Sequence, residues 1–108
     1  MTTIYAVRTS PHPGREADFE RWYDQVHLPE VLAIPGFVGA RRFRLSEHQV
    51  FPADRHASLA LYEIDDADVP GTLQRLLAAT HLNMSDALDP ASVDVGVYEA
   101  AGTERVSE

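Results

Sequence analysis

The spacing of apolar residues divides the chain into short segments of two kinds. Four segments are rich in β-branched and aromatic residues and are typical of strands: residues 3–9, 37–46, 56–64 and 92–99. Two segments carry apolar residues at intervals of three and four, which is typical of amphipathic helices: residues 15–27 and 68–79. The loops between them hold proline, glycine and short polar residues, as turns require.

The first predicted helix places one apolar stripe along residues 15–27. The members of the stripe fall at i, i+3, i+4, i+7 and i+8: Phe19, Trp22, Tyr23, Val26 and His27. Pro29 cannot donate a hydrogen bond to the carbonyl four residues back, so we expect it to interrupt the helix near His27. A short continuation through Val31 and Leu32 then ends at Pro35-Gly36.

The second predicted helix presents a stripe of three leucines, Leu73, Leu76 and Leu77. Acidic residues precede it at Asp65, Asp66 and Asp68, where negative charge stabilises a helix N-terminus. The helix is therefore expected over residues 68–79, followed by a polar loop that leads to the last strand.

The order of these elements is strand-helix-strand-strand-helix-strand, the arrangement of ferredoxin-like α+β domains. We therefore expect a four-stranded antiparallel sheet with two helices on one face. Residues 1–100 would form this single domain, and the polar residues 101–108 would form a flexible tail.

Two helices cover only one face of such a sheet, while the alternating strands offer apolar side chains to both faces. The uncovered set draws on pairs such as Tyr5/Val7, Ala60/Tyr62 and Gly96/Tyr98, and the pattern leaves open which pairs face which way. Apolar patches of several hundred Å² are rarely left bare. We therefore predict a homodimer in which two sheets pack face to face and enclose a shared interior.

Composition limits the chemistry of this domain. The 108 residues include nine Arg, no Lys and no Cys, and seventeen Asp plus Glu give a formal net charge of −8. A Schiff-base lysine, a thiolate nucleophile and Cys-ligated zinc are therefore excluded, and the acidic excess argues against nucleic acid as a partner. No apolar run reaches the length of a membrane span and the N-terminus lacks a signal-peptide pattern, so we expect a cytoplasmic protein without a membrane partner.

One run of residues resembles a known family. Residues 19–30 read Phe-Glu-Arg-Trp-Tyr-Asp-Gln-Val-His-Leu-Pro-Glu, and Ile-Pro-Gly-Phe follows at 34–37. Here the chain resembles the dimeric α+β barrel superfamily, and within it the EthD-like proteins, over nearly its whole length. The resemblance implies a ferredoxin-like fold and a dimer. Its members include polyketide cyclases, muconolactone isomerases, cofactor-free quinol monooxygenases, haem enzymes and small stress proteins, so several activities are implied.

His27 is the first candidate for catalysis, with Tyr23 one helical turn before it. An imidazole accepts and returns a proton near neutral pH, and a tyrosine hydroxyl on the same face could orient it or polarise a carbonyl. The charge of a helix C-terminus raises the pKa of His27, whereas burial lowers it. A purely structural His27, bonded to a carbonyl freed by Pro29, is the alternative, but in the resembling family this histidine often lines the pocket.

Further candidates line or flank the expected site. Trp22, Arg41, Tyr62, His81 and Tyr98 are candidate substrate-binding residues, each with a structural alternative as core, ion pair, interface or loop. Arg41, Arg42 and Arg44 alternate along one strand, so at least one should point toward a buried side and need an acidic partner or an anionic ligand. Glu30 lies three residues after His27, but two ligands do not make a metal site, and no metal is predicted.

These residues favour a cofactor-independent enzyme that transfers a proton on a small apolar carbonyl or phenolic substrate held in the barrel of the dimer. Cyclisation, isomerisation and elimination all fit a His acid/base, and oxygenation of a quinol is a related variant. The alternatives are a haem or small-molecule binding module that uses His27, and a stress or structural dimer whose barrel is filled by its own side chains.

Overall fold

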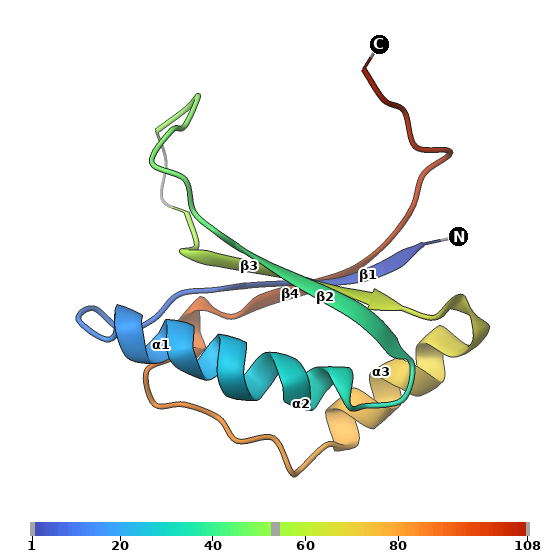
Figure 1. Ribbon diagram of the computed structural model, residues 1–108, viewed down its shortest axis with the longest axis horizontal. Helices are drawn as coiled ribbons and strands as arrows, with labels where there is room; N and C mark the ends of the chain where they lie inside the picture. Colours follow the sequence, from blue (N-terminus) through green and yellow to red (C-terminus); the bar gives the residue numbers. More distant parts are fainter. Residues whose placement is uncertain (1, 53–54, 108) are drawn as a thin grey trace.

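A single antiparallel sheet organises the chain, for which a computed structural model describes residues 2–52 and 55–107. The strand order is β2-β3-β1-β4. All helices lie on one side of the sheet (Figure 1). The bounds of the strands are β1 (Thr3–Thr9), β2 (Phe37–Arg44), β3 (Ser58–Ile64) and β4 (Asp94–Glu99). The predicted α+β fold with four antiparallel strands and helices on one face is confirmed.

The first helix runs through its proline instead of stopping before it. α1 (Glu16–Trp22) passes into a π turn, η1 (Tyr23–His27), and then into α2 (Leu28–Leu32). The N–H of Leu28 bonds to the carbonyl of Tyr23, five residues back. The expected interruption near His27 is therefore a change of helical register, and His27 does not lie at a helix C-terminus.

The second helix is α3 (Val69–Ala78), preceded by the short 3₁₀ turn η2 (Asp66–Asp68). The side chain of Asp68 accepts a hydrogen bond from the N–H of Gly71, so the predicted acidic cap is confirmed. The predicted leucine stripe is only partly right: Leu73 and Leu76 pack against the core, but Leu77 is 87% exposed and Thr72 is buried in its place. Thr72 packs against the turn at Gly36, which has a φ of +107° and no space for a side chain.

Strand pairing decides which side chains face the helices. Tyr5 lies opposite Tyr62 and Val97, and Val7 lies opposite Ala60 and Val95. Tyr5, Val7, Ala60 and Tyr62 all belong to the core that packs beneath the helices. Because side chains alternate along a strand, Gly96 and Tyr98 lie on the other face, here called the open face. The candidate pairs thus divide between the two faces.

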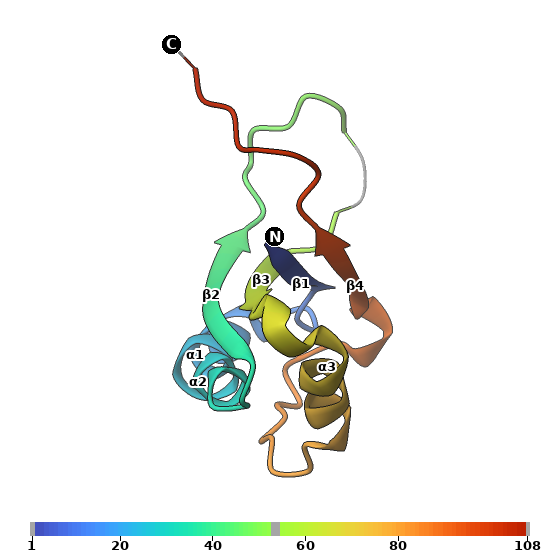
Figure 2. The ribbon, with the colours of Figure 1, turned by 90° about the vertical axis from the view of Figure 1, so that its right-hand side faces the viewer.

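The open face carries further apolar residues and is flanked by two irregular segments. Ile4, Leu59 and Leu61 alternate with the helix-facing residues of their strands and are only partly buried. The connection between β2 and β3 and the segment after β4 both extend on the side of the sheet away from the helices (Figure 2).

The last predicted strand begins later than expected, because Pro90–Ser92 form a 3₁₀ turn, η3, capped by Asp89.

Among the described residues, no helix has the length and apolar character needed to cross a membrane.

Candidate functional site

A cavity of about 220 Å³ lies between the sheet and the helices of one chain. We call it the helix-side cavity. Its walls are mainly aliphatic and aromatic, and its polar groups come from a few side chains. The lining residues that matter for chemistry are Tyr5, Thr9, Trp22, Tyr23, His27 and Tyr62. The cavity therefore lies within one protomer, on the opposite side of the sheet from the open face where a shared barrel interior was expected.

The π turn positions His27 against two aromatic rings. The imidazole stacks on Trp22, with ring centroids 4.7 Å apart and an interplanar angle of 25°. It meets the ring of Tyr23 edge-on at 5.2 Å. Residues five apart on a regular α-helix point about 140° away from each other, so Trp22 and His27 could not stack there. A regular turn already brings Tyr23 next to His27, four residues later, and the widened turn adds the ring of Trp22. Single π turns of this kind are frequent at functional sites.

Burial keeps His27 neutral. It lowers the pKa of the imidazole below its ordinary value, and the carboxylate of Glu30 only partly opposes this. The Nδ1 atom of His27 is buried and has no hydrogen-bond partner among the described residues. A structural bond from this nitrogen to a carbonyl freed by Pro29 is therefore not formed. A buried ring nitrogen without a partner is a rare and unfavourable arrangement that a bound ligand could satisfy.

Three tyrosines supply neutral hydroxyl groups to the same cavity. Burial raises the pKa of Tyr5, of Tyr23 and, most strongly, of Tyr62. Neighbouring tyrosines add to this effect at Tyr62, so all three phenols stay protonated and can donate hydrogen bonds. The hydroxyls of Tyr62 and Thr9 are buried and make no hydrogen bond of good geometry with a described residue, but both lie close enough to the hydroxyl of Tyr23 to lower its pKa in part. The cavity thus combines one neutral base with a cluster of neutral hydroxyl groups.

Arg42, on β2, packs against the ring of Tyr23 beside this cavity. Its guanidinium lies 4.4 Å from the centroid of the Tyr23 ring and bonds to Glu20 at 2.9 Å and Asp24 at 2.8 Å. It also donates to the hydroxyl of Ser58 at 3.2 Å. The side chain of Arg42 is only 8% exposed, so its two carboxylate partners compensate a largely buried charge. Arg42 fixes the ring of Tyr23 while its own charge stays balanced.

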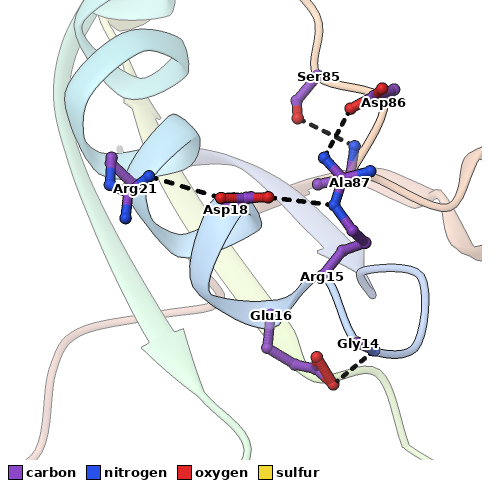
Figure 3. Close-up of polar contacts among 8 residues, drawn as sticks. All are labelled: Gly14, Arg15, Glu16, Asp18, Arg21, Ser85, Asp86 and Ala87. Atoms are coloured by element: carbon purple, nitrogen blue, oxygen red, sulfur yellow. Dashed lines mark hydrogen bonds and ion pairs between the residues drawn. The ribbon is translucent and has the colours of Figure 1, made fainter.

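The loop between α3 and β4 forms one wall of the cavity, and side chains of α1 and α2 hydrogen-bond to it. The indole of Trp22 donates to the carbonyl of Asn83 at 2.6 Å. The carboxylate of Glu30 accepts from both the backbone and the side-chain amide of Asn83, at 2.9 and 2.8 Å. At the other end of the loop, Arg15 bonds to Asp86 (Figure 3). Glu30 therefore anchors the loop through Asn83. Among the residues that the structure describes, no three potential metal ligands form a cluster, either here or elsewhere.

The structure brings together four of the seven predicted site residues. His27, Tyr23, Trp22 and Tyr62 all line the helix-side cavity. The other three do not line it. Arg41 lies on the open face over the ring of Phe43, Tyr98 lies on the same face and is 55% exposed, and His81 is exposed in the loop before β4.

Two further residues complete the polar lining of the cavity, Tyr5 and Thr9. Both fall on the same side of β1, and alternation alone predicts that they share a face. Their position next to His27 depends on the pairing of Tyr5 with Tyr62, which one sequence does not reveal. Arg42 is the one of the three alternating arginines that turns to a buried side, and its acidic partners Glu20 and Asp24 come from the first helix.

Comparisons with known proteins find solved structures of similar fold at low sequence identity. No protein-family model and no curated protein matches the chain. An EthD family protein from Bacillus halodurans C-125 aligns over 94% of this chain and 100% of its own, with a TM-score of 0.65 and 13% identity. A provisionally assigned monooxygenase from Shewanella loihica PV-4 aligns over 94% of this chain and 96% of its own, with a TM-score of 0.58 and 13% identity.

A third solved structure, HapK from Hahella chejuensis, aligns over the full length of both chains with a TM-score of 0.51 and 18% identity. At these identities the likeness establishes the fold. The chain therefore has the ferredoxin-like α+β fold of the EthD-type proteins, as the resemblance in residues 19–37 predicted.

Proposed function

We propose that the protein is a cofactor-independent enzyme in which His27 removes a proton from a small apolar carbonyl or phenolic substrate bound in the helix-side cavity. The observation that carries this proposal is the buried Nδ1 of His27, which has no partner among the described residues and whose ring has a lowered pKa. A base that is neutral and unpaired at neutral pH is ready to accept a proton.

The surrounding hydroxyls supply the second requirement of this reaction. Removing a proton from a carbon next to a carbonyl places negative charge on the carbonyl oxygen. The hydroxyl of Tyr62, with those of Tyr23 and Tyr5 nearby, can donate a hydrogen bond to that oxygen in a largely apolar cavity. The enolate then takes the proton back at another atom, attacks a second carbonyl, or expels a leaving group, which are isomerisation, cyclisation and elimination respectively.

Hydrogen exchange on a model ketone tests the proposal directly. In D₂O, the wild-type protein should accelerate exchange of the carbon-bound protons of 2-tetralone next to its carbonyl, followed by proton NMR. His27→Ala should lose about a hundredfold or more of this acceleration, a typical contribution of a positioned general base. His48→Ala removes an exposed loop histidine and should exchange as the wild type does. No acceleration by the wild type, or full acceleration by His27→Ala, would contradict the proposal.

The size of the cavity favours a ligand of one to three rings. At about 220 Å³ it lies below the range of about 300–1,000 Å³ of typical ligand pockets, which supports a small substrate over haem. Titration with haemin separates these cases, because binding through His27 would produce an intense Soret band that His27→Ala lacks.

A quinol is the second candidate substrate. The favouring observation is that one protein of the same fold is provisionally assigned as a monooxygenase. Deprotonation of a quinol by His27 would start its reaction with molecular oxygen as co-substrate, using the same base and donors. Oxygen consumption with 1,4-naphthohydroquinone, faster than autoxidation and abolished in His27→Ala, would select this reaction over proton transfer alone.

The proposed enzyme is a homodimer whose protomers pack through their open faces. Ile4, Leu61 and Tyr98 give this face an apolar centre, while Leu59, near the start of β3, borders a different cavity. Two irregular segments extend beside this face (Figure 2). An apolar surface of this kind on a soluble domain is typical of an interface. Light scattering should give the mass of a dimer for the wild type and of a monomer for Leu61→Arg. A monomeric wild type at micromolar concentration would rule out the dimer.

A further inference from the structure

A second cavity, of about 320 Å³, lies at the end of the sheet where the β2–β3 connection begins. We call it the arginine cavity. Its walls come from β1, the end of β2, the start of β3 and the connection between them: Arg8, Phe43, Arg44, Leu45, Ser46, Arg55, His56, Ser58 and Leu59. Three of the nine arginines of the chain meet here, together with a histidine and two serines. No described carboxylate lines this cavity, although the chain has a formal net charge of −8.

Arg8 and Arg44 lack the partners that most other arginines have. Arg15, Arg21, Arg42 and Arg75 all form ion pairs with carboxylates. Neither Arg8 nor Arg44 forms an ion pair or a hydrogen bond with a described side chain. Like charges brought together without counterions repel each other, so the arrangement favours binding of an anion.

The described carboxylates near Arg8 and Arg44 either bond to another arginine or form no ion pair with these two. Asp94 lies directly opposite Arg8 in the pairing of β1 with β4, but makes no ion pair with it among the described residues. Arg44 also borders a groove that contains Glu20 and Asp24, and both of these carboxylates bond to Arg42. The charges of Arg8 and Arg44 are therefore not neutralised by a carboxylate of the described residues.

We propose that the arginine cavity is a binding site for a small organic anion with a carboxylate or phosphate head and an apolar body. Guanidinium groups bind both heads through paired N–H donors, and the hydroxyls of Ser46 and Ser58 add further donors. Phe43, Leu45 and Leu59 form an apolar wall that suits a ring or short chain attached to the head. This site is separate from the helix-side cavity and does not depend on the function proposed for His27.

Calorimetry with phenyl phosphate and with benzoate at low ionic strength tests this site. The wild-type protein should bind at least one of the two, and phenol, which has the ring without the charge, should bind at least tenfold more weakly. Arg8→Gln/Arg44→Gln should lower the affinity for the bound anion at least tenfold. The control Arg21→Gln/Arg105→Gln makes the same change in net charge away from the cavity and should alter the affinity less than twofold.

Single variants distinguish anion binding from a structural role of these arginines. Arg44→Gln alone changes an exposed side chain at the end of a strand, so it should fold normally and still weaken anion binding at least threefold. His27→Ala should bind as the wild type does, since its cavity is a different one. Failure of the wild type to bind either anion would overturn the proposal, as would equal losses in the two double variants. If Arg8→Gln/Arg44→Gln dissociates a dimer while the wild type binds neither anion, the arginines serve contacts between copies and the proposal is wrong.

Discussion

The helix-side cavity and the arginine cavity border the same strands and differ in how they treat charge. Beside His27, burial lowers the pKa of the imidazole and raises the pKa values of three tyrosines, so every titratable group there is neutral near pH 7. Beside Arg44, three guanidinium groups gather without a described carboxylate in the lining. The first arrangement suits proton transfer in an apolar space, and the second suits recognition of an anion.

The difference follows from the alternation of side chains along β1. Thr9 faces the helices and lines the neutral cavity, while its neighbour Arg8 points to the opposite face and lines the arginine cavity. The helices exclude water from one face only. A charged group covered by the helices must therefore be balanced, as Arg42 is by Glu20 and Asp24. Arg8 on the open side, and Arg44, which is exposed at the end of β2, can remain hydrated.

A carboxylate introduced into each cavity should have opposite effects, and this is the largest difference we expect. Leu88 lines the helix-side cavity and is 9% exposed, so Leu88→Asp should lower the free energy of unfolding by about 3 kcal/mol or more, because its charge would be buried without a partner. Leu59→Asp should be tolerated better, because Leu59 lines the same cavity as Arg8 and Arg44. Urea unfolding at pH 7 measures both.

The asparagine variants Leu88→Asn and Leu59→Asn are matched controls, since they change shape and polarity without adding charge. Relative to asparagine, aspartate should destabilise the protein at Leu88 and stabilise it at Leu59. Aspartate less stable than asparagine at both positions would show that the arginine cavity does not favour anions. The interpretation of two electrostatically opposite cavities would then be wrong.

Two arginines separated by one residue on β2 provide the next test. Arg42→Gln leaves Glu20 and Asp24 without their common partner and removes a largely buried side chain, so it should lower the free energy of unfolding by about 2 kcal/mol. Arg44→Gln removes a charge that has no described carboxylate partner and should change stability by less than about 0.5 kcal/mol. Thermal unfolding at equal salt compares them, and similar losses would contradict the assignment of Arg44 to ligand binding.

The fold could be predicted from the sequence because it depends on patterns within each segment. The alternation in residues 3–9 and the stripe from Phe19 to His27 each specify an element and its buried face. The order of elements then leaves few topologies. Pro29 correctly predicts that the regular helix is disturbed near His27. A single sequence does not show whether the helix ends there or continues through a π turn.

The candidate site could be predicted only as far as it lies on one helix. Trp22, Tyr23 and His27 are neighbours along the chain, so their spacing predicts a common face, although the stack of His27 on Trp22 depends on the π turn. Tyr5 and Thr9 reach the same cavity through strand pairing, whose register is set by tertiary packing. Alternation along β2 does not tell which of two adjacent residues faces the helices, so it favours Arg41 no less than Arg42, and in the structure Arg42 faces them.

Removing one buried hydroxyl should separate activity from stability in the helix-side cavity. Tyr62→Phe eliminates a hydroxyl that makes no hydrogen bond of good geometry with a described residue, so the free energy of unfolding should change by less than about 1 kcal/mol. Exchange on 2-tetralone should fall about tenfold to a hundredfold, because the developing oxyanion loses a donor. Tyr98→Phe is the matched control on the open face and should change neither quantity. A destabilised Tyr62→Phe variant with full activity would assign Tyr62 a structural role.

The smallest expected effect is a shift in the titration of His27, which the single tryptophan can report. Trp22 stacks on His27, and an imidazolium quenches indole fluorescence, so emission should fall as His27 becomes protonated. Because burial lowers the pKa of His27, the midpoint should lie below about 6.5, and His27→Gln should abolish the transition.

Protonation of His27 also links its titration to folding, with a defined sign. The unfolded chain binds this proton at higher pH than the folded chain, so the stability due to neutral His27 is complete above about pH 6.5 and is lost as the pH falls through the lower, folded pKa. Proton-transfer activity should decrease over the same range, because the protonated ring cannot act as a base. A fluorescence midpoint above 6.5 would mean that an acidic group outweighs burial at His27, and the contrast between a neutral and a charged cavity would then fail at its central residue.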